Sequence, residues 1–255
     1  MTDAKPLASG HNDTIGDVRI SWHRAGAGDE RPAELNDFRT ALAAGAELIE
    51  FDLRKLSDGE IAVFHDPATH DGTLLSTIGL QELREKTGSN IPTFHEVLAE
   101  LSGKCIAHID LKEEGYEDEV IERATTAMGE QFVITSLEDN SIATIKTHSP
   151  RIRVGLSLGR DMKGTGFGNH VATRLSELFP RKRVTLAQPD FLTVNHKLAR
   201  ISLLRYSARH HIPLWIWTVD DTKTQEFFLK RPEVEVLITN QPRAAAGIRQ
   251  RLQSS

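Results

Sequence analysis

Residues 48–66 read LIEFDLRKLSDGEIAVFHD, in which two apolar runs, 47–53 and 60–64, are joined through Ser57-Asp58-Gly59. Those three residue types are a turn signal, so the two runs are expected to form the arms of a β-hairpin. Charged side chains lie within the first run and directly after the second. The hairpin is therefore expected to contribute both to the core and to a site for chemistry.

On both sides of this hairpin, strand-like apolar runs alternate with amphipathic, helix-like stretches. Strands are expected at 18–22, 47–53, 60–64, 104–111, 132–135, 152–158, 191–194, 213–219 and 234–239. Helices are expected at 32–44, 80–86, 94–101, 118–128, 140–146, 171–179, 198–210, 222–229 and 243–252. With the hairpin counted as one strand, eight β/α units follow one another, which is typical of an α/β fold of the (β/α)8 TIM-barrel type.

The alternative architecture is an open, doubly wound sheet. No GxGxxG motif follows the first expected strand, which weakens the dinucleotide-binding version of that fold. Residues 1–16 are expected to form a flexible N-terminal tail and residues 17–255 a single domain. The Gly-rich stretch 159–168 lacks the spacing of a phosphate-binding loop and is interpreted as a mobile loop at the rim.

Composition limits the classes of function. The chain of 255 residues is 39% hydrophobic and 26% charged, which is enough for a sizeable core. A net charge of −5 gives no sign of a nucleic-acid binder. The single cysteine, Cys105, lies in an apolar run and is expected to be a buried, inert thiol.

No targeting or spanning segment is visible in the sequence. The N-terminus is polar, and no apolar run approaches the ~18 residues of a spanning helix. The protein is therefore expected to be cytoplasmic, without stable insertion into a membrane, and a transient visit to a membrane surface stays open.

Acidic residues recur two positions apart on the expected strands. Glu50 and Asp52 point to one face of their strand, and Asp110 and Lys112 repeat that spacing on a later one. Buried carboxylates on one face repel each other and lose hydration, which a cation can offset. Three carboxylates without a Cys or His ligand set favour Mg²⁺ or Ca²⁺ over zinc. The alternative is a structural ion pair between Asp110 and Lys112.

Two histidines follow expected strands directly. His23 and His65 can each act as acid or base near neutral pH. Together with a cation, Arg24 and Lys112, they describe a phosphate-ester site, where positive charges neutralise the phosphoryl oxygens while the histidines move protons. His108 alternates in phase with Asp110 and is expected to face the barrel interior.

Trp217 lies within the seventh expected barrel strand, which is followed by Asp220. It either walls the substrate pocket, where its ring and N–H would both serve, or belongs to the barrel core.

These residues resemble the glycerophosphodiester phosphodiesterase family over nearly the whole chain. The run GAELIEFDLRKLSDGEIAVFHDP is similar to the family's central GAD-IE-DV-x-T-x-DG-x-x-V-x-HD block. The other similar segments, in chain order, are His23-Arg24 for HR(G), Ile109-Asp110-Leu111-Lys112 for I-E-x-K, Ile134-Thr135-Ser136-Leu137 for the S-F strand end, Trp217-Thr218-Val219-Asp220 for W-T-V-N, and Ile238-Thr239-Asn240-Gln241-Pro242 for I-x-T-D-x-P.

The resemblance implies a TIM barrel with a small insertion after the second strand, at about 54–92. It implies hydrolysis of glycerophosphodiesters, small-molecule substrates, to glycerol 3-phosphate and an alcohol. The residues that it implies are a metal set of Glu50, Asp52 and Asp110, an acid–base pair of His23 and His65, and a phosphate-binding pair of Arg24 and Lys112. The family's proposed route uses the neighbouring glycerol hydroxyl as an internal nucleophile.

Several positions depart from the family pattern. Ala25 stands where the family has glycine, Asp110 replaces glutamate, and the family's PENT motif reads Arg31-Pro32-Ala33-Glu34. Glu30 and Glu34 are the candidates for the glutamate of that motif. An aspartate followed by Leu-Lys also resembles the sphingomyelinase D and lysophospholipase D relatives. Two alternatives therefore stay open: the same chemistry on another phosphodiester, and a non-catalytic barrel that binds a phosphorylated ligand.

Overall fold

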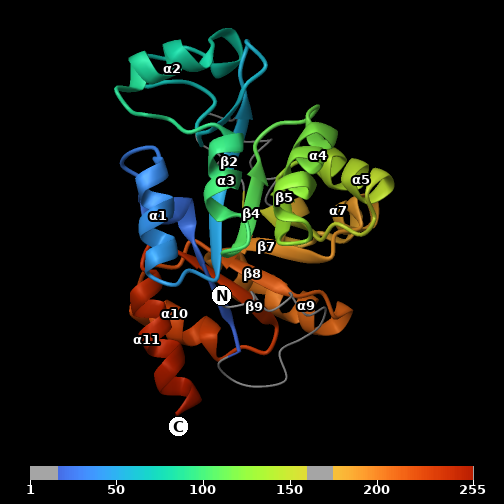
Figure 1. The fold of residues 1–255 in the computed structure, drawn as a ribbon. Coiled ribbons are helices and arrows are strands. Elements are labelled where there is room, and N and C mark those ends of the chain that lie inside the picture. Colours follow the sequence, from blue (N-terminus) through green and yellow to red (C-terminus); the bar gives the residue numbers. More distant parts are fainter. Residues whose placement is uncertain (1–16, 160–174, 255) are drawn as a thin grey trace.

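The computed structural model describes residues 17–159 and 175–254. Within them, one sheet runs in the order β1-β9-β8-β7-β6-β5-β4-β2-β3, and a further pairing between β1 and β2 closes it into a ring. The strands are β1 (Arg19–Trp22), β2 (Leu48–Lys55), β3 (Ile61–Val63), β4 (Ile106–Leu111), β5 (Phe132–Ser136), β6 (Val154–Leu158), β7 (Phe191–Asn195), β8 (Leu214–Trp217) and β9 (Val234–Thr239). All neighbouring strands are parallel except β3, which is the antiparallel arm of the hairpin with β2. The predicted (β/α)8 barrel is thus confirmed (Figure 1).

Helices surround this ring (Figure 1). They are α1 (Leu35–Ala43), α2 (Leu80–Thr87), α3 (Phe94–Leu101), α4 (Glu117–Met128), α5 (Asp139–His148), α7 (Arg181–Ala187), α8 (His196–Leu198), α9 (Leu204–His210), α10 (Thr222–Leu229) and α11 (Pro242–Gln253). Short helical turns lie at η1 (His23–Gly26), η2 (Leu75–Thr77) and η3 (Ala199–Leu203). No helix among the described residues is long and apolar enough to cross a membrane.

Most predicted elements are found within one or two residues of their predicted ends, and 94–101, 222–229 and 234–239 match at both ends. No element is predicted at 181–187, where the structure has α7. The predicted helix 198–210 begins earlier, at His196, and is divided between α8, η3 and α9. The stretches 160–168 and 171–174, predicted as a rim loop and a helix start, lie outside the described residues.

Side chains in the first turn fix where two of the matching helices begin. The hydroxyl of Thr93 accepts a hydrogen bond from the Glu96 N–H at 3.1 Å, and the Glu96 carboxylate accepts one from the Thr93 N–H at 2.8 Å. This reciprocal capping satisfies two amides that the helix itself leaves without partners. Asp221 caps α10 with one such bond, accepting from the Thr224 N–H at 2.9 Å.

The hairpin leads into a small lobe of the chain. Residues that follow β2, including β3, η2 and α2, form this lobe, which lies at the top of Figure 1. Its separate apolar cluster consists of Leu56, Ala62, Leu75, Ile78, Leu83 and Ile91. Because this cluster holds the lobe together, the lobe can act as one wall beside the barrel mouth.

The barrel interior is layered. At the N-terminal ends of the strands, the rings of Phe191 and Trp215 stack with centroids 4.2 Å apart. A side chain at Gly155 would place its Cβ 2.2 Å from the Phe191 ring, so glycine is required there. His108 forms the next layer, edge-on to Trp215 at 4.9 Å. Charged side chains lie above it, at the C-terminal ends, where barrel enzymes place their chemistry.

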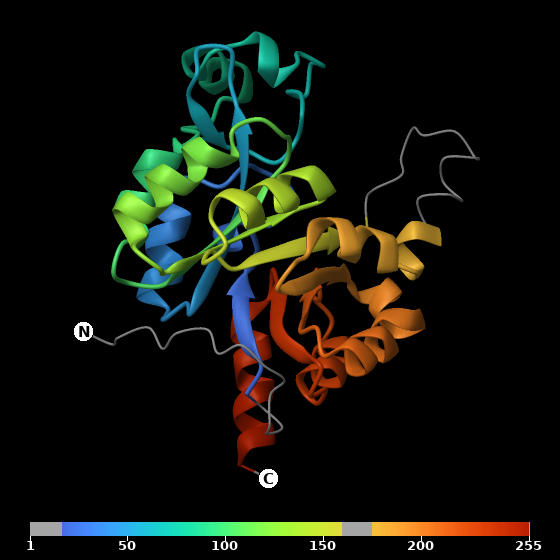
Figure 2. The same cartoon turned by 90° about the vertical axis from the view of Figure 1, so that its right-hand side faces the viewer.

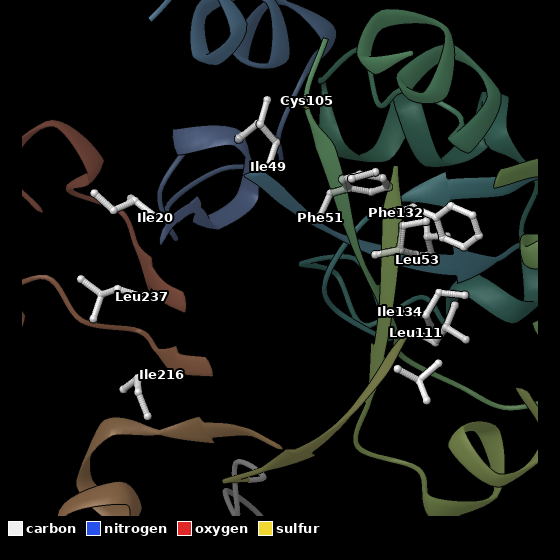
Figure 3. Packing of buried hydrophobic residues seen from close by; sticks show 14 of the residues in the cluster. Ile20, Ile49, Phe51, Leu53, Cys105, Leu111, Phe132, Ile134, Ile216 and Leu237 are labelled. Atoms are coloured by element: carbon white, nitrogen blue, oxygen red, sulfur yellow. The ribbon is translucent and has the colours of Figure 1, made fainter. Parts of the chain in front are cut away.

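A larger apolar core lies between the strands and the outer helices, and Figure 3 shows a part of it. Cys105 belongs to this core and is 1% exposed. Burial raises the pKa of its thiol to about 12, which agrees with the prediction of an inert thiol.

Candidate functional site

Three carboxylates converge inside the C-terminal end of the barrel. Neighbouring strands β2 and β4 are in a register that places Asp52 beside Asp110 and Glu50 beside His108. The alternation along both strands turns these side chains inward. Glu50, Asp52 and Asp110 are 5%, 3% and 8% exposed, so their charges are removed from water. The sequence therefore predicted correctly that these acids share one buried face.

The ammonium of Lys112 lies between two of these acids. Its Nζ is 2.7 Å from Asp52 Oδ1 and 2.6 Å from Asp110 Oδ2. Burial alone disfavours the ammonium, but Asp110 and Asp52 outweigh it and raise the pKa of Lys112. Thr135 donates a further hydrogen bond to Asp110 Oδ1 at 2.5 Å. The structural ion pair that the sequence left as an alternative is therefore present, and it includes Asp52 as well.

Glu50 has no such cation. It accepts a hydrogen bond from the Arg24 N–H at 2.8 Å. Burial, and then the charge of Asp52, raise the pKa of Glu50 well above its usual value. No group of three or more His, Cys, Asp or Glu side chains within 17–159 and 175–254 is arranged to hold a metal as the chain stands. The donor set nevertheless fits a hard cation, because all three acids offer oxygen ligands. The Lys112 ammonium already places one positive charge between Asp52 and Asp110.

Arg24 reaches the acids from an unusual stretch of backbone. Arg24 and Ala25 both have left-handed backbone angles, with φ of 46° and 53°. Non-glycine residues rarely adopt this region, and it costs of order 1 kcal/mol or more per residue. The turn brings Arg24 Nε to 3.4 Å from Asp52 Oδ2, yet this nitrogen is buried without a hydrogen-bond partner. Ala25 therefore tolerates a conformation for which the similar family motif has glycine.

His23 is held by an amide. Its Nδ1 lies 2.8 Å from Asn240 Oδ1, and the Asn240 side chain donates from Nδ2 to Asp220 Oδ2 at 3.0 Å. Because Asp220 fixes the amide orientation, Nδ1 of His23 must be the donor, which leaves Nε2 as an acceptor. Burial above all lowers the pKa of His23. The sequence placed Asp220 and Asn240 at strand ends without a role for either.

The two supporting residues stand in the reverse order of the similar motifs. W-T-V-N and I-x-T-D-x-P have asparagine first and aspartate second, whereas this chain has Asp220 and Asn240. The acid and the amide thus stand on the opposite strands from those of the similar motifs, and in this chain they form a hydrogen bond. This exchange was the feature of the sequence that could have indicated that Asp220 and Asn240 act as a pair.

His65 approaches from the hairpin. The Phe64 N–H donates to the Asp52 carbonyl at 3.0 Å, which anchors the chain one residue before the imidazole. His65 Nδ1 lies 2.7 Å from Asp66 Oδ1, and the imidazole side chain is 42% exposed. Burial is the main cause that lowers the pKa of His65, while Asp52 and Asp66 oppose it. Nδ1 of His65 thus lies at hydrogen-bond distance from a carboxylate, whereas Nδ1 of His23 lies at that distance from an amide and is 3.7 Å from Asp29 Oδ1.

A cavity of about 420 Å³ opens between η1 and the lobe. Arg24, Asp52 and His65 line it, together with residues 29–33, 63–64, 66–70 and 86–87 and Phe51. Glu30 lies on this lining, whereas Glu34 caps α1 and accepts from the Asn90 N–H at 3.0 Å. Of the two candidates for the missing glutamate, only Glu30 thus faces the cavity.

The other predicted site residues do not line this cavity: His23, Glu50, His108, Asp110, Lys112 and Trp217. Trp217 ends β8, in register with Asn195 of β7, and packs against the apolar cluster inside the barrel. His108 is 2% exposed and contacts Ser21 and Thr135, as expected of an inward-facing side chain. The site is therefore open mainly toward Arg24 and His65.

Comparison with known proteins agrees with this geometry. Residues 23–244 match the model of the Glycerophosphoryl diester phosphodiesterase family. The chain is 24% identical over 226 residues to a glycerophosphodiester phosphodiesterase of Caldanaerobacter subterraneus subsp. tengcongensis, covering 80% of this chain and 86% of that protein.

Solved structures share the fold. A structure from Silicibacter pomeroyi, described as a putative glycerophosphoryl diester phosphodiesterase, superposes with a TM-score of 0.76, 16% identity and 96% coverage of both chains. A phosphodiesterase of Oleispira antarctica in complex with the product sn-glycerol-3-phosphate gives a TM-score of 0.69 and 18% identity, over 93% of this chain and 97% of that one. With the family match spanning the site from His23 to beyond Asn240, the chain belongs to the glycerophosphoryl diester phosphodiesterase family.

Proposed function

We propose that the chain hydrolyses glycerophosphodiesters to glycerol 3-phosphate and an alcohol, with one divalent cation and with His23 and His65 as the acid–base pair. The observation that carries the proposal is the buried Arg24 Nε, which has no hydrogen-bond partner and belongs to a residue lining the cavity. A buried donor without a partner costs free energy unless a ligand completes it. A phosphoryl oxygen is a suitable ligand, because guanidinium groups bind phosphate strongly.

Glu50, Asp52 and Asp110 would hold the cation, Mg²⁺ or Ca²⁺. A divalent ion there would supply positive charge against the phosphoryl oxygens. The raised pKa of Glu50 supports this assignment, since a nearby cation would stabilise its charged form. In this proposal Lys112 shifts its ammonium from the two aspartates toward the phosphate.

The surroundings of the two histidines suggest separate roles. His23 faces the neutral Asn240, so its Nε2 is suited to accept the proton of the attacking hydroxyl. His65 faces Asp66, and a carboxylate favours an imidazolium that can protonate the leaving alcohol. The neighbouring hydroxyl of the glycerol unit attacks phosphorus, and water then opens the resulting cyclic phosphate with the histidine roles reversed. Trp217 is proposed to wall the substrate at the barrel end.

The test measures glycerol 3-phosphate released from glycerophosphocholine, with EDTA and then with Mg²⁺ or Ca²⁺ restored. We expect release that depends on metal and falls about 10²–10⁴-fold in His23→Ala and in His65→Ala. His148→Ala is the matched control, because His148 is an exposed histidine 2.9 Å from Asp118 and lies far along the chain from the site. Equal activity in all three variants would contradict the assigned roles.

A second candidate is the same chemistry on another phosphodiester, such as a lysophospholipid. Asp110 in place of the family's glutamate, followed by Leu111 and Lys112, favours it. Release of headgroup or choline from lysophosphatidylcholine, but not from glycerophosphocholine, would select this candidate. If neither substrate is cleaved and Asp110→Ala changes only phosphate-ester affinity, the non-catalytic reading replaces both.

A further inference from the structure

Charge is distributed very unevenly along this chain. Residues 178–219 contain seven Lys or Arg and one acid, Asp190, and so carry a formal charge of +6. The whole chain carries −5, so the rest of the molecule carries −11. This positive segment includes α7, β7, α8, η3, α9 and β8, which form one sector of the barrel. The overall acidity of the protein therefore hides a basic surface.

Two of the seven cations have structural partners. Arg183 binds Asp139 with Nε at 2.7 Å, and Arg200 stacks over the Phe227 ring at 4.5 Å. The other five are exposed side chains that form no ion pair with any described residue: Arg181, Lys182, Lys197, Arg205 and Arg209. Their positive charge is thus available to something outside the chain.

Exposed apolar side chains gather on the same sector. Among the described residues, the large apolar side chains that remain exposed are Leu74, Leu175, Phe179, Leu186 and Ile201. All but Leu74 lie in or directly before the basic segment, and Phe179 and Ile201 are 70% and 66% exposed. Single exposed apolar residues are ordinary, but several of them beside unpaired cations indicate a surface that binds another molecule.

The helices of this sector are neighbours in space. Ser202 in η3 donates to the Leu178 carbonyl at 3.0 Å, which joins η3 to the helical residues 175–178 and to Phe179 directly after them. The charge of Arg181 reaches Tyr206 of α9, where it opposes the rise in pKa that burial causes. Figure 2 shows the gold and orange helices that follow β6 and β7 next to one another on one side of the barrel. We define the basic apolar surface as Leu175, Phe179, Lys182, Leu186, Ile201 and Arg205.

We propose that the basic apolar surface docks the protein on an anionic lipid surface. Lysine and arginine side chains are attracted to anionic headgroups, and exposed Phe, Leu and Ile side chains insert at the boundary with the acyl chains. A nucleic acid would use the cations but would leave the aliphatic side chains in water. The combination of both features is what favours a lipid partner.

Docking there would bring the barrel mouth close to the lipid. β7 ends at Asn195, in register with Trp217 at the C-terminal end of the barrel, and Ile201 follows only six residues later. The cavity itself lies beside β2 and β3, across the ring from β7. The docking itself does not depend on the proposed hydrolysis, and its test involves no catalysis.

The test is sedimentation of the full chain with vesicles of phosphatidylcholine alone and of an equimolar mixture with phosphatidylglycerol. We expect binding to the anionic vesicles that weakens with salt, and little binding to the neutral ones. Each cation removed should weaken binding about fivefold, so Lys182→Glu with Arg205→Glu should weaken it at least about 25-fold. Phe179→Ser with Ile201→Ser should weaken it as well.

Matched controls lie elsewhere on the molecule. Lys104→Glu with Lys223→Glu reverses two exposed lysines outside the sector, and Leu74→Ser removes the exposed apolar residue of the lobe. Both controls should bind like the unchanged protein, and thermal unfolding would verify that every variant is folded. Absence of binding to anionic vesicles, or equal loss in the controls, would overturn the proposal. Binding to duplex DNA that needs the cations but not Phe179 would replace it by a nucleic-acid site.

Discussion

At the N-terminal end of the barrel, Glu235 accepts hydrogen bonds from Arg153 at 2.8 and 2.6 Å and from Trp215 Nε1 at 2.9 Å. At the C-terminal end, Glu50 accepts one backbone hydrogen bond and faces other acids, while Arg24 Nε lies 3.4 Å from Asp52 Oδ2 without a hydrogen-bond partner. Both groups are buried, but only the first is matched in charge and hydrogen bonds. A matched buried charge stabilises one conformation, whereas an unmatched one is kept for a ligand.

The largest expected effect follows from removing Glu235, the acid at the N-terminal end of the barrel. Glu235→Ala leaves Arg153 partly buried without its bidentate partner, and losses of this kind cost about 3–5 kcal/mol in the free energy of unfolding. Urea denaturation would measure the change. Phosphodiesterase activity of the remaining folded protein should be nearly unaffected, and a large loss of activity without a loss of stability would contradict the division between the two ends.

His108, which lies between the two ends of the barrel, should make the stability of the protein depend on pH. Burial lowers the pKa of His108 to about 3, so the unfolded chain binds a proton near pH 6 that the folded protein does not. The contribution is fully present above about pH 6.5 and is lost as pH falls toward 3, with a magnitude on the order of 5 kcal/mol. Denaturation between pH 7 and pH 4 should show a smaller slope in His108→Gln. Equal slopes would show that His108 protonates without unfolding.

Glu50→Gln separates function from stability at the C-terminal end. Since burial and Asp52 already disfavour the charge of Glu50, a neutral isostere that still accepts from the Arg24 N–H should leave stability within about 1 kcal/mol. Metal-dependent activity should fall at least about 10²-fold, because one proposed ligand loses its charge. Titration of activity against Mg²⁺ measures this. A strong loss of stability would mean that Glu50 is structural, like Glu235.

The smallest expected effect concerns the support of His23. The double variant Asp220→Asn with Asn240→Asp restores the order of the similar motifs and places a carboxylate next to His23 Nδ1. A carboxylate favours the imidazolium and should move the acid limb of the pH–rate profile upward by about one unit, or ~1.4 kcal/mol. Asn240→Ala, which removes the contact, serves as the comparison. An unchanged profile would mean that His23 does not act as the base.

The fold was largely predictable because each element carries its own signal. Helix α3 has its capping pair Thr93 and Glu96, and α10 has Asp221, so both were located correctly from local sequence. Helix α7 follows Pro180 and has no side-chain cap. Without a local start signal, its basic sequence did not indicate a helix. Local patterns thus predict elements where the caps are local too.

The site was predictable in its residues but not in their contacts. The alternation along β2 and β4 indicated that the acids share a face, as found. That Lys112 would bridge Asp52 as well as Asp110 depends on the register between strands, which no single strand encodes. The support of His23 by Asn240 joins residues 217 positions apart, and only the closed ring creates it.

That last contact has a consequence for biogenesis. The barrel is closed by β1, which pairs with β9 and with β2. The pairing of β1 with β9 can therefore form only after the last strand has been synthesised. Contacts between such distant segments slow folding, because a long loop must close before they form. On a translating ribosome, His23 would have its strand neighbour β2 early but neither β9 nor Asn240. If His23 acts as proposed above, turnover requires a closed ring and would report completion of folding more strictly than helix content does.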